Sequence, residues 1–117
     1  MPNELKERTQ EFALRVIQLV RALPAGFEAQ VIGRQLLRSA TSVGANYRSA
    51  CRGRSRAEFL AKLGVVEEEA DESVYWLELI IKSKMLPTTR IEPLLAEANE
   101  LVAIFVSAKR TTKNRRT

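Results

Sequence analysis

The sequence contains no histidine, a single cysteine, and only five glycines and four prolines. Without histidine, the Ser-His-Asp and Cys-His arrangements of nucleophilic catalysis cannot form. Imidazole-ligated zinc sites and the Glu-x-x-His di-iron motif of helical bundles are excluded for the same reason. The lone Cys51 excludes an internal disulfide and suits a reducing compartment. We therefore expect a cytoplasmic protein that is not an enzyme and has no metal or cofactor.

Long hydrophobic runs are also missing. No stretch approaches the ~20 uncharged apolar residues of a membrane span. The first dozen residues hold Glu4, Glu7 and Glu11 instead of the apolar block of a signal peptide. A chain of 117 residues with 45% apolar residues has room for one core. The composition predicts a single domain over residues 1–110 that does not associate with a membrane.

Apolar residues recur at spacings of three and four, which predicts helices. Proline and glycine separate four such segments, at about 4–23, 27–52, 56–85 and 90–109. Short connections favour antiparallel neighbours, so the predicted fold is all-α, an up-down-up-down four-helix bundle. Residues 111–117 hold bases and no core residue, and we expect a flexible basic tail there.

Local signals refine these boundaries. Ser55 and Glu58 have the spacing of a capping box, as do Thr89 and Glu92, and Asn3 is an N-cap candidate. The predicted core positions follow heptad-like steps in each segment: Leu5, Thr9, Phe12, Val16, Leu19, Leu23; Ala29, Ile32, Leu36, Ala40, Val43, Tyr47, Ala50; Phe59, Leu63, Val66, Ala70, Ser73, Val74, Leu77, Ile81; Leu94, Ala98, Leu101, Phe105, Ala108.

Positive charge is unevenly distributed, because 24–54 and 88–117 are net basic and 55–87 is net acidic. Four arginines of the second helix lie opposite its core stripe, and such a face with a basic tail is typical of phosphate-backbone binders. The only aromatic residue nearby, Tyr47, points toward the core, which favours recognition of shape or backbone over base stacking. The predicted nucleic-acid-binding residues are Arg34, Arg38, Arg48, Arg52, Lys109, Arg110, Lys113, Arg115 and Arg116.

The alternative is that the arginines pair with the acidic third helix of the same or a neighbouring subunit. Its carboxylates fall on two faces, whereas a hard cation needs several oxygens that converge. We therefore expect charge pairing and not a metal site from Glu67, Glu68, Glu69, Asp71, Glu72 and Glu78.

The third helix is apolar on a second face, nearly opposite its core stripe. A helix of this kind is either central or covered by another subunit, and tryptophan is favoured at interfaces. The predicted homo-oligomer interface is Ala61, Val65, Trp76 and Leu79, unless Trp76 packs sideways on a neighbouring helix. On the second helix, Ser39, Ser42 and Asn46 predict a polar contact at a helix–helix or subunit seam.

Three stretches together resemble a known family: residues 37–46 (Leu-Arg-Ser-Ala-Thr-Ser-Val-Gly-Ala-Asn), 54–59 (Arg-Ser-Arg-Ala-Glu-Phe) and 76–78 (Trp-Leu-Glu). They resemble the bacterial four-helix bundle proteins. That family includes proteins encoded in intervening sequences of large-subunit ribosomal RNA genes and the accessory variability protein of diversity-generating retroelements. Residues 46–50 read Asn-Tyr-Arg-Ser-Ala where many members have Asn-Ile-Ala-Glu-Gly, and the usual Trp-Gln pair is absent from the opening segment.

The resemblance implies an antiparallel bundle that assembles as a pentamer and has a basic surface for nucleic acid. For the retroelement branch it also implies a partner reverse transcriptase. With the arginine face and the second apolar face, it predicts a non-enzymatic homo-oligomer that binds structured RNA or DNA. The alternative is a protein-interaction scaffold or accessory subunit, for example to a reverse transcriptase, without nucleic-acid binding.

Overall fold

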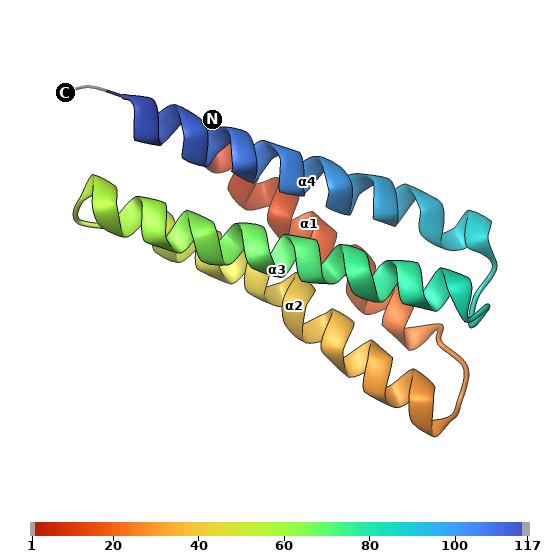
Figure 1. Ribbon diagram of the computed structural model, residues 1–117. Coiled ribbons are helices and arrows are strands. Elements are labelled where there is room, and N and C mark those ends of the chain that lie inside the picture. Colours follow the sequence, from red (N-terminus) through yellow and green to blue (C-terminus); the bar gives the residue numbers. More distant parts are fainter. Residues whose placement is uncertain (1, 116–117) are drawn as a thin grey trace.

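Four helices run antiparallel in the computed structural model (Figure 1). The structure describes the backbone of residues 2–115 and the side chains of residues 4–115. They are α1 (Pro2–Arg21), α2 (Phe27–Cys51), α3 (Arg56–Lys82) and α4 (Thr88–Asn114). The described part contains no strand, so the predicted all-α, four-helix architecture is confirmed. The bundle is elongated, 52 × 20 × 20 Å, and the start of α1 and the last turn of α4 lie at the same end as the α2–α3 connection (Figure 1).

The core follows the predicted spacing, with small differences near the helix ends. Phe12, Leu36, Leu77 and Phe105 are among the side chains with no exposure to solvent. In α3 the step of three after Leu77 makes Ile80 the buried residue, and the predicted Ile81 is half-buried. Ile32, in the second turn of α2, is also half-buried. So are four predicted core residues at or near the helix ends, where fewer neighbours cover a side chain: Leu5, Leu23, Phe59 and Ala108.

The helix α3 ends earlier than predicted. The N–H of Lys84 donates to the Ile81 carbonyl (3.0 Å) and that of Met85 to the Ile80 carbonyl (3.3 Å), which is the hydrogen-bond pattern of a Schellman motif. Lys84 adopts a left-handed conformation with φ of 62°. The helix therefore stops at Lys82 instead of continuing to about Met85.

The two predicted capping boxes have different outcomes. The Ser55 hydroxyl accepts from the Glu58 N–H (3.1 Å), but the Glu58 carboxylate accepts from the N–H of Arg54 (2.9 Å), one residue before the expected donor. The Thr89–Glu92 box is wrong. Pro87 is the N-cap residue and has no side-chain cap, so Thr89 already lies inside the helix, where it cannot take the extended N-cap conformation.

The first and last helices extend beyond their predicted limits. Helix α4 continues to Asn114, so residues 111–114 are helical, and the tail predicted to begin at 111 is wrong for them. The half-buried Thr112 and the contact of the Arg115 carbonyl with Arg56 hold this last turn against the bundle. Residues 116–117 of the predicted tail lie outside the described residues. Helix α1 already includes Asn3, whose side chain is not among those described.

None of the helices in the described part is both long and apolar enough to cross a membrane.

Replacing Lys84 by glycine should stabilise the protein by about 1 kcal/mol, because a left-handed conformation strains any residue that has a Cβ atom. The measurement is the free energy of unfolding from urea titrations followed by circular dichroism. As a control, Lys82→Gly in the last turn of α3 should destabilise by up to about 1 kcal/mol. Equal effects of the two substitutions would contradict the assigned helix end.

Candidate nucleic-acid interface

Arg38 lies between α2 and α3 and pairs with two carboxylates of the same chain. Its guanidinium is 3.2 Å from a Glu69 oxygen and donates to Glu72 as well. The hydrogen bond with Glu72 is the main reason that the pKa of Arg38 is raised. For Arg38 the alternative interpretation, pairing with the third helix, is therefore correct, and much of its charge is already compensated.

The other three arginines of the predicted face are exposed and make no ion pair with any residue that the structure describes: Arg34, Arg48 and Arg52. They do not lie together. Arg34 borders a hollow beside Leu23 and Pro24, near the α1–α2 connection. Arg48 and Arg52 lie at the other end of α2, ~21–27 Å further along the axis at ~1.5 Å per residue.

The predicted basic residues of α4 also divide into two groups. Lys109 pairs with Glu67 on α3 at 3.0 Å. Arg110, Lys113 and Arg115 are exposed, and their side chains make no ion pair within the described range. Arg116 lies outside the described residues.

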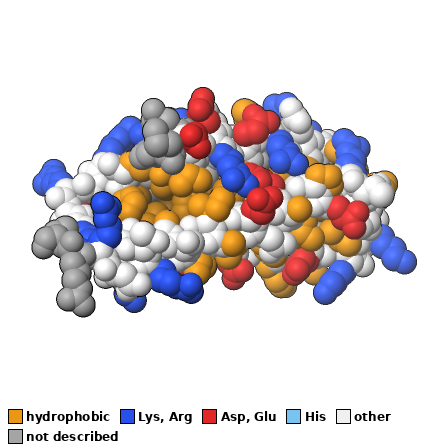
Figure 2. All heavy atoms as spheres, turned by 90° about the horizontal axis from the view of Figure 1, so that it is seen from above, with side chains coloured by type: hydrophobic (Ala, Val, Ile, Leu, Met, Phe, Trp, Pro, Cys, Tyr) orange, Lys and Arg blue, Asp and Glu red, His pale blue; other side chains and the backbone are white. Residues whose placement is uncertain are grey.

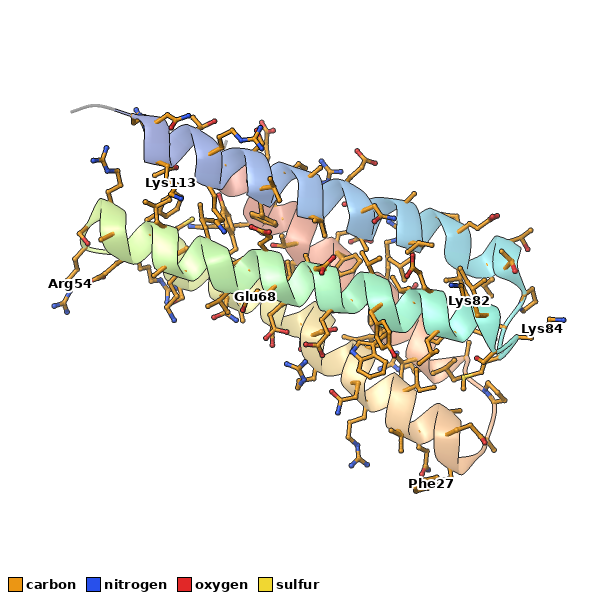
Figure 3. All side chains as sticks on the ribbon, viewed as in Figure 1. Phe27, Arg54, Glu68, Lys82, Lys84 and Lys113 are labelled. Carbon is orange, nitrogen blue, oxygen red and sulfur yellow. The ribbon has the colours of Figure 1, made fainter. Side chains whose placement is uncertain are left out.

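The α2–α3 connection and the last turn of α4 meet at one end of the bundle. The Arg56 guanidinium donates to the carbonyl of Arg115, and the side chains of Arg54 and Lys113 lie at this same end (Figure 3). Neither stretch 45–57 nor stretch 101–115 contains an aspartate or glutamate. We call the resulting group the basic end: Arg48, Arg52, Arg54, Arg56, Lys113 and Arg115.

Two members of the basic end, Arg54 and Arg56, are absent from the predicted site. A helical-wheel projection of the second helix could not include them, because both residues follow the last turn of that helix. The sequence signal that identifies them is the acid-free run through 45–57, together with the capping residue Ser55, which starts the next helix there.

The basic end also borders a cavity of about 640 Å³, which the sequence analysis missed. Its lining includes the cations Lys6, Arg56 and Arg115 and the apolar side chains of Cys51 and Phe59. Figure 2, which looks onto the face above α4, shows an apolar area toward the same end with basic side chains near it.

The four predicted interface residues are not one continuous apolar patch. Ala61 and Val65 are exposed, and Leu79 is half-buried. Trp76 is half-buried against the core, and its indole N–H donates to Glu72 of the same helix (3.0 Å). Along the axis, Val65 and Trp76 are ~16 Å apart at ~1.5 Å per residue.

A polar contact does form at the α2–α3 seam. The hydroxyls of Ser39 and Ser73, both fully buried, are 2.8 Å apart, within hydrogen-bond distance. This confirms the predicted helix–helix contact for Ser39. The Asn46 amide instead donates to the Ser42 carbonyl (2.9 Å) within α2.

Three of the acidic residues of α3 are partners of bases. Glu67, Glu69 and Glu72 pair with basic side chains of α2 and α4, which confirms the predicted charge pairing for these three. Glu68 projects outward from the middle of α3 (Figure 3). Within residues 2–115, no three cysteine, aspartate or glutamate side chains are grouped so that they could hold a metal ion.

The protonation of Glu72 should be detectable through the fluorescence of Trp76. The hydrogen bond from Trp76, followed by that from Arg38, lowers its pKa below the ordinary value of 4.5. The fluorescence of Trp76, the only tryptophan, should therefore change with a midpoint below pH 4.5 while circular dichroism shows that the helices remain. Glu72→Gln should abolish this titration, and the matched Glu68→Gln should leave it intact. A midpoint at or above 4.5 would contradict the assigned contact.

The stability of the protein should follow the same group. A lowered pKa in the folded state means that the Glu72 carboxylate stabilises the fold above its unfolded-state pKa, and that this contribution is lost as the pH falls through the folded-state pKa. The difference in free energy of unfolding between the native protein and Glu72→Gln should thus be present at pH 7 and absent well below 4.5.

Comparisons with known proteins agree with this architecture. A search of curated proteins finds no match. One solved structure that is similar comes from Bacteroides thetaiotaomicron and is a protein of unknown function from the S23 ribosomal protein family. It is 35% identical with a TM-score of 0.84, and the match covers 93% of this chain and 97% of that one. The model of the 23S rRNA-intervening sequence protein family matches residues 2–107. The family resemblance seen in the sequence is thereby confirmed, and the chain belongs to the 23S rRNA-intervening sequence protein family.

Proposed function

We propose that this protein binds structured nucleic acid through the basic end. The observation that carries the proposal is the position of six cations at one end of the bundle, in two stretches that contain no acidic residue and that meet where Arg56 donates to the Arg115 carbonyl. Cations grouped in this way attract the phosphate backbone and release its counterions, which favours binding without base-specific contacts. The description of the family, 23S rRNA-intervening sequence protein, makes a structured RNA the first ligand to test and a DNA duplex the second.

The basic end replaces the long arginine face as the proposed contact surface. Arg38 and Lys109 already pair with carboxylates of α3, so binding there would require these contacts to be exchanged. Arg34 is more than 20 Å from the α2–α3 connection at ~1.5 Å per residue. Arg48 and Arg52, one turn apart at the end of α2, need no such exchange, and Arg54 and Arg56 continue the positive surface across the connection.

We further propose that the protein assembles with copies of itself through the outer surface of α3. Val65 and Tyr75 are exposed by 37% and 55%, although both are large apolar or aromatic side chains, and Ala61 adds a small one. The pentamer implied by the family resemblance would present the basic end several times. Repetition raises the effective affinity for one long ligand without any new contact.

The double variant Arg48→Gln/Arg52→Gln tests the basic end. It should weaken binding to a fluorescent RNA hairpin and lower the slope of log affinity against log salt by roughly 2, about one per lost phosphate contact. Arg90→Gln, an exposed arginine at the start of α4 and the opposite end, is the matched control and should leave the slope unchanged. Fluorescence anisotropy at several salt concentrations provides both quantities.

Two outcomes would contradict the proposal. Equal slopes for the double variant and Arg90→Gln would mean that binding takes place elsewhere. A native protein that binds neither RNA nor DNA at low salt would favour the alternative function, a scaffold or accessory subunit for a protein partner, such as a reverse transcriptase. In that case a pull-down that survives nuclease treatment should recover one stoichiometric protein.

Val65→Glu tests self-assembly, because a carboxylate at a position that another copy covers must be desolvated. The variant should have a lower mass in multi-angle light scattering than the native oligomer. Leu14→Glu is the control, since Leu14 is an exposed apolar residue on α1, 49% accessible, and should leave the mass unchanged. A monomeric native protein, or an unchanged mass for Val65→Glu, would contradict this interface.

A further inference from the structure

We propose that the cavity at the basic end receives a single unpaired nucleotide of a bound RNA, with the phosphate at the cationic rim and the base against the apolar floor. The inference rests on the proposed nucleic-acid binding and specifies which part of the ligand this end of the bundle recognises.

All four helices contribute to the cavity. Lys6 comes from α1, Cys51 from α2, Phe59 from α3 and Thr112 from α4, and Gly53 and Ser55 of the α2–α3 connection complete the lining. Of the four neighbouring helix pairs, α1 and α4 have the least contact with each other. Its volume of about 640 Å³ lies within the ~300–1,000 Å³ range of small-molecule sites. A nucleotide fits such a volume, whereas a duplex does not.

The rim of the cavity is positive. Lys6 comes from α1, Arg56 from α3 and Arg115 from the end of α4, where it is the C-cap residue. None of the described residues that line the space is acidic. Arg56 donates to the Arg115 carbonyl and so is held in place, but a guanidinium has five donors, and the others remain for a ligand. Three cations around an opening complement a phosphate group.

The floor of the cavity is apolar and partly aromatic. It is formed by Tyr47, Ala50, Cys51 and Phe59. Tyr47 is buried, and its ring packs against that of Phe105 with 5.5 Å between ring centroids, so the floor is continuous with the core. Burial raises the pKa of the Tyr47 hydroxyl, which therefore stays neutral. A flat uncharged base is suited to such a surface, and only an unpaired base, freed from its own stack, can reach it.

Cys51 makes the inference testable, because it is the only cysteine in the sequence and lines this cavity. A ligand in the cavity should shield its thiol, whereas a ligand on the outer surface should not. The rate at which Cys51 reacts with the thiol reagent 5,5′-dithiobis(2-nitrobenzoate) thus reports on occupancy, independently of RNA binding measured by anisotropy.

The experiment compares two RNA hairpins with the same stem, one blunt and one with a single-stranded 3′ overhang, each at ten times its Kd. The overhang RNA should slow the reaction of Cys51 roughly tenfold, because only the unoccupied fraction reacts, and the blunt RNA should leave the rate nearly unchanged. Lys6→Gln and Arg56→Gln should each reduce the protection, and Arg90→Gln should not. Circular dichroism checks that each variant is folded. If Arg56→Gln unfolds the end of α4, the loss of Cys51 protection in Lys6→Gln alone tests the cavity.

Each contrary result has a distinct meaning. If both hairpins bind and neither protects Cys51, or both protect it equally, the cavity inference is wrong and the proposed function stands. If neither hairpin binds, the proposed function fails and the inference fails with it. Decanoate is tested in the same assay, because its carboxylate and apolar chain also match the cations and the apolar floor of the cavity. If decanoate protects Cys51 and the overhang RNA does not, the nucleotide assignment is overturned.

Discussion

The close contact between α2 and α3 determines the arrangement of the rest of the molecule. Two small buried side chains, Ser39 and Ser73, bring their hydroxyls within 2.8 Å of each other, and Arg38 bridges the same seam at its solvent edge. A larger side chain at either serine would have to displace the facing helix, because cores have no spare space. The same two helices are joined by the short connection from 52 to 55, where the arginines of both helices lie.

The ion pairs of the bundle divide its charges into compensated and available ones. Arg8 holds Glu97 through two hydrogen bonds of 2.7 and 2.8 Å and links α1 to α4, where the packing of these helices is sparse. Arg38 and Lys109 pair with α3 in the same way. Solvent-accessible ion pairs typically stabilise a protein by at most about 1 kcal/mol each. They also compensate the charges of Arg8, Arg38 and Lys109, whereas the side chains of the basic end form no ion pair with a described residue.

Periodicity was sufficient to predict the four helices and nearly all of the core, because burial repeats with the helix itself. It failed where local chemistry decides: the positive φ of Lys84 ends α3 early, and Pro87 displaces the expected cap at Thr89. Only some members of the basic end could be predicted from the sequence. Arg48 and Arg52 stand out on a helical wheel, but the contact of Arg56 with the Arg115 carbonyl depends on how α4 returns along α3. The pairing of Arg38 likewise depends on carboxylates more than thirty positions further along the chain.

The sparse packing between α1 and α4 has a consequence for the order in which the molecule opens. A helix held mainly by one neighbour belongs to the least protected cooperative unit of a fold, and α1 packs chiefly on α2. The backbone amides of α1 should therefore exchange with solvent through smaller openings than those of α3, which lies between two helices. Because Lys6 lies on α1, this wall of the cavity belongs to the part of the bundle expected to open at the lowest free energy. A ligand bound there would raise the free energy of unfolding.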